Sequence, residues 1–358
     1  MPKVTLGKIA QERRETCSGD KSSYPVVGLE HLTPGEVRLS AWAEGGDNTF
    51  TKRFYKGDVL FGRRRAYLKK AAQAPFDGVC SGDITVIKPI SGKVLSELLP
   101  FIIQNDSFFK YAIRNSAGSL SPRVKWSALE NYEINLPSAD EQGRLAELLW
   151  AAIDLKASYQ RSLAASDDLV KSRFMEMFIA GAPYPREPLK NFITQIRGVS
   201  YKPEDLHPSL DDDSVLLLRA NNIGDRLINH DEVQFVAKEK VAQNQLIQEG
   251  DILVCASSGS LEHVGKAALC SRSVAGETFG AFCKLIRPHG SLLPEYIASY
   301  LCTDEYRETI MQLACGSNIN NLKTEHIDEL QIPVPNDDEQ MRFITCVHSL
   351  DKSKFCGP

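Results

Sequence analysis

The sequence predicts an α+β protein in which two tandem β-rich domains with small helices are joined by long coiled-coil spacer helices. Three observations predict this class: an internal repeat, strand-length apolar runs within each copy, and a heptad-patterned segment between the copies. With 358 residues, the chain exceeds the size at which a single core keeps growing, so two domains are the default.

The internal repeat spans most of the chain. Gly118-Ser119 is followed 24 residues later by Gln142, and Gly316-Ser317 stands at the same distance from Gln340, 198 residues further on. In both copies the Gln closes a Glu-Gln pair that comes shortly after a proline. A repeat of this length is far longer than a solenoid unit of roughly 20–50 residues, so it indicates a duplicated domain.

Strand-length apolar runs recur in the same order in both copies and are bounded by Gly-Asp turns or by a proline. They span 26–29, 59–61 and 84–87 in the first copy, and 215–218, 252–254 and 282–286 in the second. A helix is expected next in each copy, over 94–111 and over 294–313. A short helical turn and an extended segment, 133–136 or 330–333, then lead to the Glu-Gln pair.

The segment between the copies predicts a spacer helix. From Glu141 to about Phe178, apolar or small residues recur at alternating steps of three and four, which predicts a coiled-coil helix of ~55 Å. Gly181-Ala-Pro183 is a helix stop, and a second spacer starting at Glu339 is cut short at Pro358. The expected subunit-interface residues are Leu145, Leu148, Ala152, Leu155, Tyr159, Leu169, Phe343, Val347 and Leu350.

These patterns divide the chain into a first domain at 1–138, a central spacer at 139–181, a second domain at 182–337 and a truncated second spacer at 338–358. A lone helix with an exposed apolar stripe gains little stability by itself. Because the second spacer is short, part of the stripe is expected to stay uncovered near 169–177, where another chain would complete it.

Composition favours a cytoplasmic protein with a basic and an acidic half. Residues 1–138 carry 20 Lys and Arg against 14 Asp and Glu, whereas residues 181–338 carry 14 against 23. A basic domain suits nucleic acid, and an acidic one does not exclude it because only the facing surface matters. No apolar run approaches the ~20 residues of a membrane span. The nine cysteines lie at least ten positions apart, which argues against a CxxC motif and a disulfide framework.

No catalytic or metal site is expected, and no cofactor. Ser260–Lys266 resembles a phosphate-binding loop but lacks the correctly spaced first Gly and the metal-binding hydroxyl, so a strand-flanking loop is favoured. His263 beside Glu262 has no partner at ligand spacing. Asp211–Asp213 lacks the Gly turn and Glu of a calcium loop, so it is interpreted as a solvated loop.

The basic stretch 52–70 is the strongest binding candidate. It holds eight Lys and Arg against one acid, with Arg63-Arg64-Arg65 directly after an apolar run. Arginine pairs bidentately with guanine edges and with phosphates, so these residues predict a DNA-readout loop, with a solvated strand end as the alternative. The loops after the Gly-Ser pairs, and two weaker segments of the second copy, offer hydrogen-bonding side chains or a helix-capping turn. The candidate DNA-binding residues are Lys52, Arg53, Arg63, Arg64, Arg65, Lys69, Lys70, Ser119, Arg123, Lys125, Arg219, Asn221, Asn222, Ser258, Asn318, Asn320, Asn321 and Lys323.

The whole arrangement resembles the specificity subunit of type I restriction–modification systems. The matching motifs are the Gly-Asp turns at 57 and 250, the Gly-Ser pairs at 118 and 316, and the Glu-Gln pairs at 141 and 339. The resemblance implies two target-recognition domains that each read one half of a split DNA sequence, and no catalysis by this chain. It also implies spacers that set the gap and dock two adenine-methyltransferase subunits, which a nuclease–translocase subunit can join.

The resemblance further implies that methyl donor and ATP are used by those partners. The short second spacer departs from the family pattern. A truncated or decayed scaffold without sequence-specific DNA binding is therefore the alternative.

Overall fold

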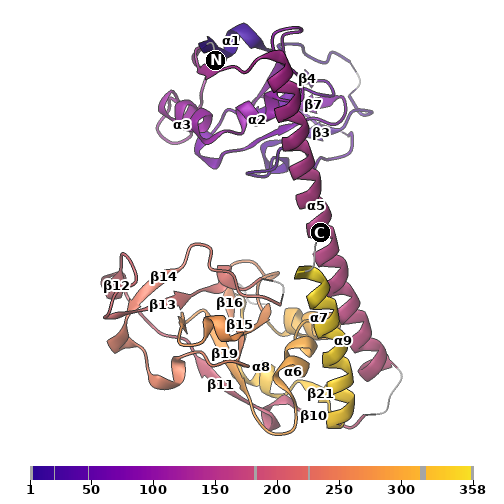
Figure 1. The fold of residues 1–358 in the computed structure, drawn as a ribbon, viewed down its shortest axis with the longest axis vertical. Coiled ribbons are helices and arrows are strands. Elements are labelled where there is room, and N and C mark those ends of the chain that lie inside the picture. Colours follow the sequence, from indigo (N-terminus) through magenta and orange to yellow (C-terminus); the bar gives the residue numbers. More distant parts are fainter. Residues whose placement is uncertain are drawn as a thin grey trace. The chain divides into compact units, whose positions relative to one another are not determined.

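The structure is a computed structural model that describes residues 3–19, 21–46, 48–180, 184–224, 226–314 and 320–355, with only the backbone described at 320 and 351–355. The chain forms two compact units, Met1–Tyr159 (unit 1) and Gln160–Pro358 (unit 2), and the helix α5 (Ala139–Met175) runs from one into the other (Figure 1). Helices and sheets are mixed in both units, as the sequence predicts.

Unit 1 is built around small sheets. The four-stranded antiparallel sheet has the order β2 (Ala10–Glu12), β8 (Ile84–Pro89), β5 (Val59–Gly62) and β6 (Ala71–Gln73). The three-stranded sheet has the order β3 (Val26–Val27), β7 (Gly78–Cys80) and β4 (Lys52–Phe54), and β1 (Lys3–Thr5) pairs with β9 (Glu133–Asn135). The last pairing joins the start of the unit to the segment that leads into α5.

Unit 2 repeats this plan. Its four-stranded antiparallel sheet has the order β11 (Ile193–Arg197), β19 (Cys283–Pro288), β15 (Ile252–Cys255) and β17 (Ala267–Leu269). A second sheet has the order β12 (Leu206–His207), β14 (Gln234–Ala237), β13 (Ser214–Leu218) and β18 (Thr278–Phe279). The ribbon β10 (Arg186–Pro188) with β21 (Gln331–Pro333) corresponds to β1 with β9, and β16 (Ser257–Ser258) pairs with β20 (Asn320–Asn321).

The single helix expected after the strands is two helices in each unit. Unit 1 has α2 (Leu99–Ile103) and α3 (Asp106–Arg114), and unit 2 has α6 (Pro294–Tyr300) and α7 (Asp304–Ala314). The breaks come from local capping, because Asn105 accepts a hydrogen bond from the Ser107 amide and the Thr303 hydroxyl accepts one from the Tyr306 amide. The remaining α-helices are α1 (Leu6–Ile9), α4 (Trp126–Leu129), α8 (Thr324–Asp328) and α9 (Asp337–Phe355).

The repeated Gly-Asp turns are structural. The glycine before each aspartate has φ of 92° and 89°, a conformation that favours glycine. Asp58 and Asp251 are both buried, and each carboxylate is held by a two-pronged arginine. The Arg13 guanidinium, from the segment after β2, donates hydrogen bonds to the two Asp58 carboxylate oxygens at 2.7 and 3.2 Å. The Arg287 guanidinium, from β19, donates to the two Asp251 carboxylate oxygens at 2.8 and 2.7 Å.

The repeated Glu-Gln pairs are structural as well, because each buried Gln fastens the start of its spacer helix to the loop before α2 or α6. Gln142 accepts a hydrogen bond from the Leu95 amide at 3.0 Å and donates to the Pro137 carbonyl at 3.0 Å. Gln340 accepts a hydrogen bond from the Leu293 amide at 2.8 Å and donates to the Ser291 and Pro335 carbonyls at 3.0 and 3.3 Å. The motif that reveals the repeat therefore marks helix anchoring.

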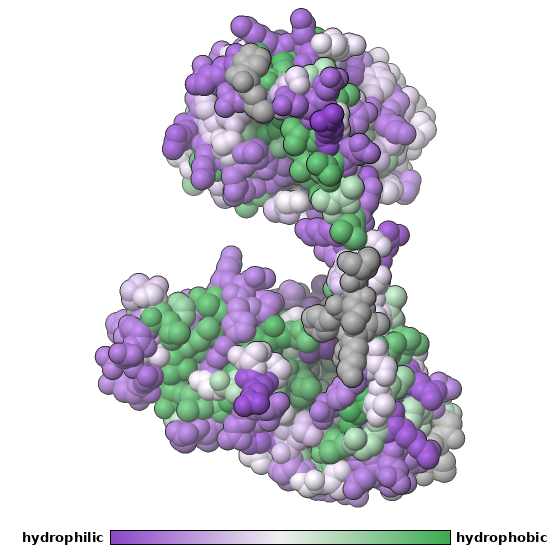
Figure 2. Space-filling view, viewed as in Figure 1, coloured by the Kyte–Doolittle hydropathy of each residue, from purple (hydrophilic) through white to green (hydrophobic). Residues whose placement is uncertain are grey.

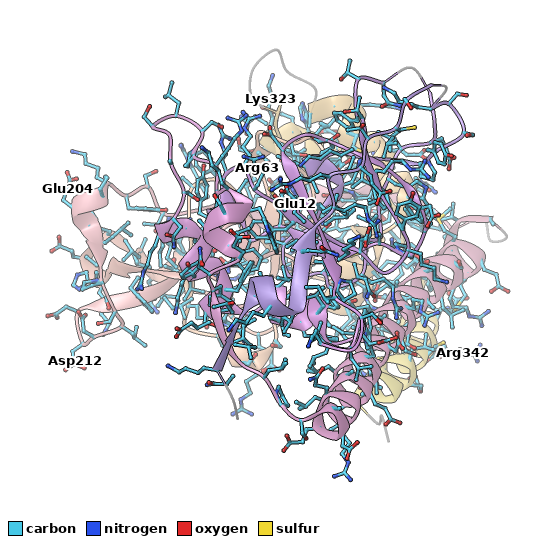
Figure 3. All side chains as sticks on the ribbon, turned by 90° about the horizontal axis from the view of Figure 1, so that it is seen from above. Glu12, Arg63, Glu204, Asp212, Lys323 and Arg342 are labelled. Carbon is cyan, nitrogen blue, oxygen red and sulfur yellow. The ribbon has the colours of Figure 1, made fainter. Side chains whose placement is uncertain are left out.

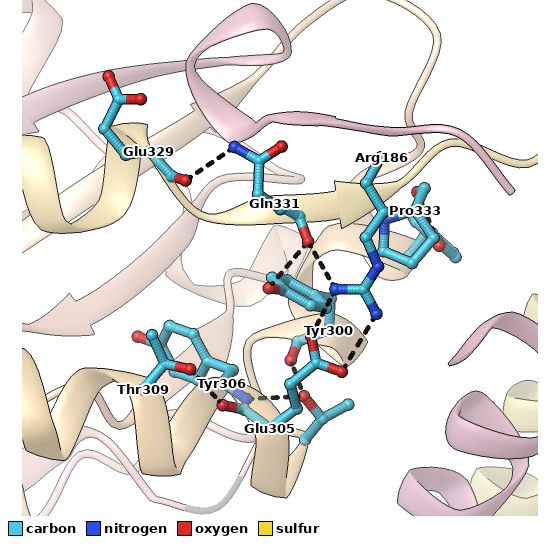
Figure 4. A network of polar contacts seen from close by, with 10 residues as sticks. Arg186, Tyr300, Glu305, Tyr306, Thr309, Glu329, Gln331 and Pro333 are labelled. Carbon is cyan, nitrogen blue, oxygen red and sulfur yellow. Dashed lines mark hydrogen bonds and ion pairs between the residues drawn. The ribbon is translucent and has the colours of Figure 1, made fainter. Parts of the chain in front are cut away.

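The ribbon of β10 and β21 is tied to α7 by a polar network (Figure 4). Arg186 donates to both carboxylate oxygens of Glu305, at 2.6 and 3.3 Å, and to the Gln331 carbonyl at 3.2 Å. Hydrogen bonding to Glu305 raises the pKa of the Arg186 guanidinium. Tyr300 donates to the same Gln331 carbonyl. These contacts lie on the helix side of unit 2 and hold its first and last strands in place.

The spacer helix is present, but its buried face differs from the predicted seam. Unit 1 holds the N-terminal part of α5 through Gln142, Ala146 and Trp150, whose indole donates to the Glu97 carbonyl at 2.9 Å. The predicted seam residues Leu145, Leu148, Leu155, Tyr159 and Leu169 are exposed instead, and Ala152 is exposed too. The buried face of α5 is formed by residues one position after those of the predicted seam, such as Ala146 after Leu145 and Val170 after Leu169. The predicted seam is therefore a separate, exposed apolar stripe on the same helix. On the view of Figure 2, hydrophobic patches interrupt the mostly hydrophilic surface of both units.

The end of the stripe that the sequence predicts to be uncovered, near 169–177, is covered only in part, because Leu169 is 50% exposed. Phe174 is fully buried there, and its ring centroid lies 5.4 Å from that of Phe343 on α9, which runs beside this part of α5 in Figure 1. Phe343 and Val347 are buried in the core of unit 2, with Leu350 packed against it. The helix α9 is therefore an internal part of unit 2 and covers α5 at Phe174, while Leu169 of the predicted seam stays exposed.

Candidate nucleic-acid interface

Two basic loops of unit 1 that lie far apart in the sequence are joined through their backbones. The Val124 amide donates to the Arg63 carbonyl at 3.0 Å, and the Arg65 amide donates to the Pro122 carbonyl at 2.7 Å. Arg64 and Arg123 form an antiparallel bridge between these two contacts. We call residues 63–65 together with 117–125 loop pair 1.

Asp83 organises the cations of loop pair 1. The Arg123 guanidinium donates to Asp83 at 2.7 and 3.3 Å, and Arg64 donates to the same carboxylate at 3.4 Å and to the Ser121 hydroxyl at 2.7 Å. Hydrogen bonding from Arg123 lowers the pKa of the Asp83 carboxyl, so this group stays ionised near neutral pH. The two guanidiniums are thereby held side by side while remaining partly exposed. Such an arrangement can donate to phosphates or guanine edges.

Unit 2 has the same joint between the corresponding loops. The Leu322 amide donates to the Ala256 carbonyl at 2.8 Å, and Ser257 pairs with Asn321 as Arg64 does with Arg123. We call residues 256–258 together with 320–323 loop pair 2. Asn321 and Lys323 are exposed, and Lys323 precedes α8; Arg63 and Lys323 are both labelled in Figure 3. Asn318 lies outside the described residues, and only the backbone of Asn320 is described.

The two loop pairs share a backbone but differ in chemistry. The Asp83 carbonyl accepts a hydrogen bond from the Arg63 amide, and the Phe282 carbonyl accepts one from the Ala256 amide, so Phe282 occupies the position of Asp83. The Arg64, Asp83 and Arg123 positions of unit 1 are therefore Ser257, Phe282 and Asn321 in unit 2. Loop pair 1 is cationic, and loop pair 2 is mostly neutral.

Comparison with known proteins places both units in one family. A family model described as "Type I restriction modification DNA specificity domain" matches residues 7–161 and 221–355, which is most of the chain and includes both loop pairs. The chain belongs to this family of specificity domains.

Individual relatives agree. The chain is 40% identical over 153 residues to the StySPI specificity subunit of Salmonella potsdam and 39% identical over 149 residues to the EcoKI specificity subunit of Escherichia coli K12. These alignments cover 43% and 41% of this chain, but only 33% and 32% of the relatives. The fold is similar to that of a type I restriction–modification S subunit from M. genitalium. That likeness has a TM-score of 0.54 and 14% identity, and it covers 99% of this chain and 90% of the other.

Several candidate residues of the first specificity domain have structural partners. Lys52 donates to the Ile84 carbonyl at 2.7 Å, and burial lowers its pKa. Lys70 donates to the Leu29 carbonyl at 2.7 Å, and Lys69 pairs with Asp106 on α3. The Arg53 guanidinium stacks on a tyrosine ring. These four residues support the strands and helices around the loop.

The second specificity domain shows a similar division. Asn222 is fully buried, where it accepts from the Arg219 amide at 2.8 Å and donates to the Asp231 carbonyl at 2.7 Å. Arg219 donates to the Glu232 carbonyl, and Asn221 lies on the same turn. This segment stabilises its own turn. Ser258 is half-buried in β16, within loop pair 2.

Sequence reasoning missed three residues at the loop pairs. Leu120, at 91% exposure, and Phe282, at 68%, are the most exposed large hydrophobic side chains described in loop pair 1 and in unit 2, respectively. Phe282 was assigned to the strand that follows it, but β19 begins at Cys283. Asp83, which positions two arginines, carried no sequence motif. Aligning 84–89 with 283–288 could have revealed that Phe282 stands where unit 1 has an aspartate.

Ser260–Lys266, the segment that resembles a phosphate-binding loop, is held by hydrogen bonds from two side chains of α7. Arg307 donates to the Val264 and Glu262 carbonyls at 2.7 Å each, and the Tyr306 hydroxyl donates to the Gly265 carbonyl at 2.9 Å. Within the described ranges, no cluster of three or more His, Cys, Asp or Glu could hold a metal ion. A search of the same residues finds no helix with the length and apolarity to cross a membrane.

Proposed function

We propose that this chain is a non-catalytic DNA-recognition subunit of a type I restriction–modification complex. Each unit reads one half of a split DNA target through its loop pair, and methyl transfer and ATP use belong to partner subunits. The observation that carries the proposal is the joint that both units form between their loops. The same backbone contacts occur in both units, whereas the side chains that they present differ in chemistry. A constant frame with different side chains is suited to reading two different sequences.

The spacer helix would act as the ruler and docking element of the complex. Leu148 and Leu155 on α5 are 68% and 64% exposed, and they form an apolar stripe separate from the face used inside the units. Apolar stripes at heptad spacing pair with other helices in coiled coils. Adenine-methyltransferase subunits, which a nuclease–translocase subunit can join, are the partners that the family suggests for this stripe.

Salt-dependent DNA binding tests the role of loop pair 1. The triple variant Arg63→Gln, Arg64→Gln and Arg65→Gln removes three charges but keeps side-chain length. It should weaken DNA binding and lower the slope of log K against log salt by ~0.9 for each phosphate that the protein no longer neutralises. If bases are read as well, mapped adenine methylation in the presence of the methyltransferase should show one half-site relaxed.

The matched control removes three charges elsewhere in unit 1. Lys8, Lys93 and Arg114 are exposed and lie outside loop pair 1, so their change to Gln alters net charge equally. The control variant should keep most of the slope of log K against log salt that the wild type shows. Equal slopes for wild type and the loop variant, with unchanged thermal melts, would refute the assignment and favour a scaffold without DNA recognition.

A further inference from the structure

Phe282 stands out because the fold does not need an aromatic side chain at its position. Its carbonyl accepts hydrogen bonds from the Ala256 and Ser257 amides at 2.9 and 3.0 Å, so the backbone is fixed at the rim of loop pair 2. The side chain is nevertheless 68% exposed. Unit 1 builds the same joint with Asp83, which shows that the backbone role is compatible with a polar residue.

Two polar, uncharged residues of loop pair 2 replace the paired arginines of loop pair 1. Ser257 and Asn321 occupy the positions where unit 1 has Arg64 and Arg123, and Phe282 itself stands where unit 1 has the Asp83 carboxylate. A large apolar group on a polar rim is unfavourable in water and becomes favourable when a partner covers it. The apolar group that base pairs offer in the major groove is the C5-methyl of thymine, and Asn is suited to the adenine edge of an A·T pair.

We propose that Phe282 is a specificity-determining residue of unit 2 that recognises a thymine by contact with its C5-methyl group. The inference rests on the proposed function of the chain. It assigns to unit 2 an apolar readout of an A·T pair, with Asn321 beside it, in contrast to the guanidinium-based readout of unit 1.

Removing the methyl group from DNA tests the contact directly. The target is mapped from adenine methylation by the full chain with its methyltransferase, and the half-site relaxed by the loop pair 1 triple variant is assigned to unit 1. In the other half-site, each thymine is replaced by uracil in synthetic duplexes. Wild type should lose about tenfold in affinity at one such position. Phe282→Ala should bind thymine and uracil duplexes equally at that position, with affinity near that of wild type for uracil.

Controls separate this contact from general effects. Phe282→Leu should keep part of the thymine preference, and Leu210→Ala, an exposed apolar change elsewhere in unit 2, should keep all of it. Thymine replacement in the unit 1 half-site should affect wild type and Phe282→Ala alike.

Three results would overturn the inference while leaving the proposed function intact: a unit 2 half-site without thymine, no uracil sensitivity in wild type, or a Phe282→Ala loss of equal size on both duplexes. In each case specific methylation of a split target would persist. Failure of the proposed function itself would instead appear as the absence of any split target.

Discussion

At the scale of single residues, each unit pairs a buried aspartate with an arginine, but the arginine comes from a different segment in each unit. A buried aspartate follows the repeated turn in each, and its arginine comes from the segment after β2 in unit 1 but from β19 in unit 2. A buried carboxylate without a partner is costly, so the exchange of partner strands preserves the charge pair while the surrounding sequence changes.

Arg287→Ala should therefore destabilise unit 2 strongly. The change leaves the buried Asp251 carboxylate without its two-pronged partner, and we expect a loss of about 3–5 kcal/mol in the free energy of unfolding. Lys190→Ala breaks an ion pair with Glu329 in which both side chains are at least half exposed, so its effect on stability should be much smaller than that of Arg287→Ala. Urea titrations of both variants measure the difference, and similar midpoints would show that Asp251 needs no partner.

The basic residues of 52–70 also show which roles could not be predicted from the sequence. The run of charge at 52–70 predicted a binding loop, and Arg64 does lie in loop pair 1. Lys52 and Lys70, in the same run, are directed to backbone carbonyls. Charge alone could not separate these roles, because the separation depends on which strands the flanking residues join. Phe282 was missed for the same reason, since an apolar residue before a strand has no distinguishing pattern.

At the scale of elements, the positions of several strands along the chain and the existence of α5 could be predicted, since both depend on local periodicity. The buried face of α5 could not. The helix carries two apolar stripes, and the heptad pattern selected the one that stays exposed. Ala146 is buried on the part of α5 in unit 1, and Val170 and Phe174 pack in the core of unit 2. Only tertiary contacts decide between two such stripes.

Gln340 offers a test of how α9 is anchored. Gln340→Leu keeps similar bulk but leaves the Leu293 amide and two carbonyls without their hydrogen bonds. We expect a loss of about 3 kcal/mol in the stability of unit 2, because each unsatisfied buried group costs about 1–3 kcal/mol. Gln312→Leu, on the exposed side of α7, should change stability by less than about 0.5 kcal/mol. Thermal melts of the two variants test this difference. Equal melting temperatures for Gln340→Leu and Gln312→Leu would show that the Glu-Gln pair does not anchor α9.

At the scale of the whole molecule, the exposed stripe of α5 predicts a separation between stability and assembly. Leu148→Ser with Leu155→Ser should leave the melting temperature of the lone chain almost unchanged, because both side chains are already exposed. The same variant should lose binding to the methyltransferase in size-exclusion chromatography. Leu210→Ser with Met341→Ser, at exposed positions away from the stripe, serves as the control. Retained assembly by the stripe variant would exclude this surface as the docking face.

Under the proposed function, the length of α5 sets the gap between the two half-sites of the DNA target. Asp154 is paired with Arg38 of unit 1 and Asp167 with Arg226 of unit 2, so residues inserted near Ser162 leave both anchors in place. Four inserted helical residues add about 6 Å, which corresponds to roughly two base pairs, and both half-sequences should stay the same. Mapping methylated adenines in the insertion variant measures the new gap, and the same insertion at the exposed turn of Gly35 should leave the gap unchanged. An active variant with an unaltered gap would show that α5 tethers the units without fixing their spacing.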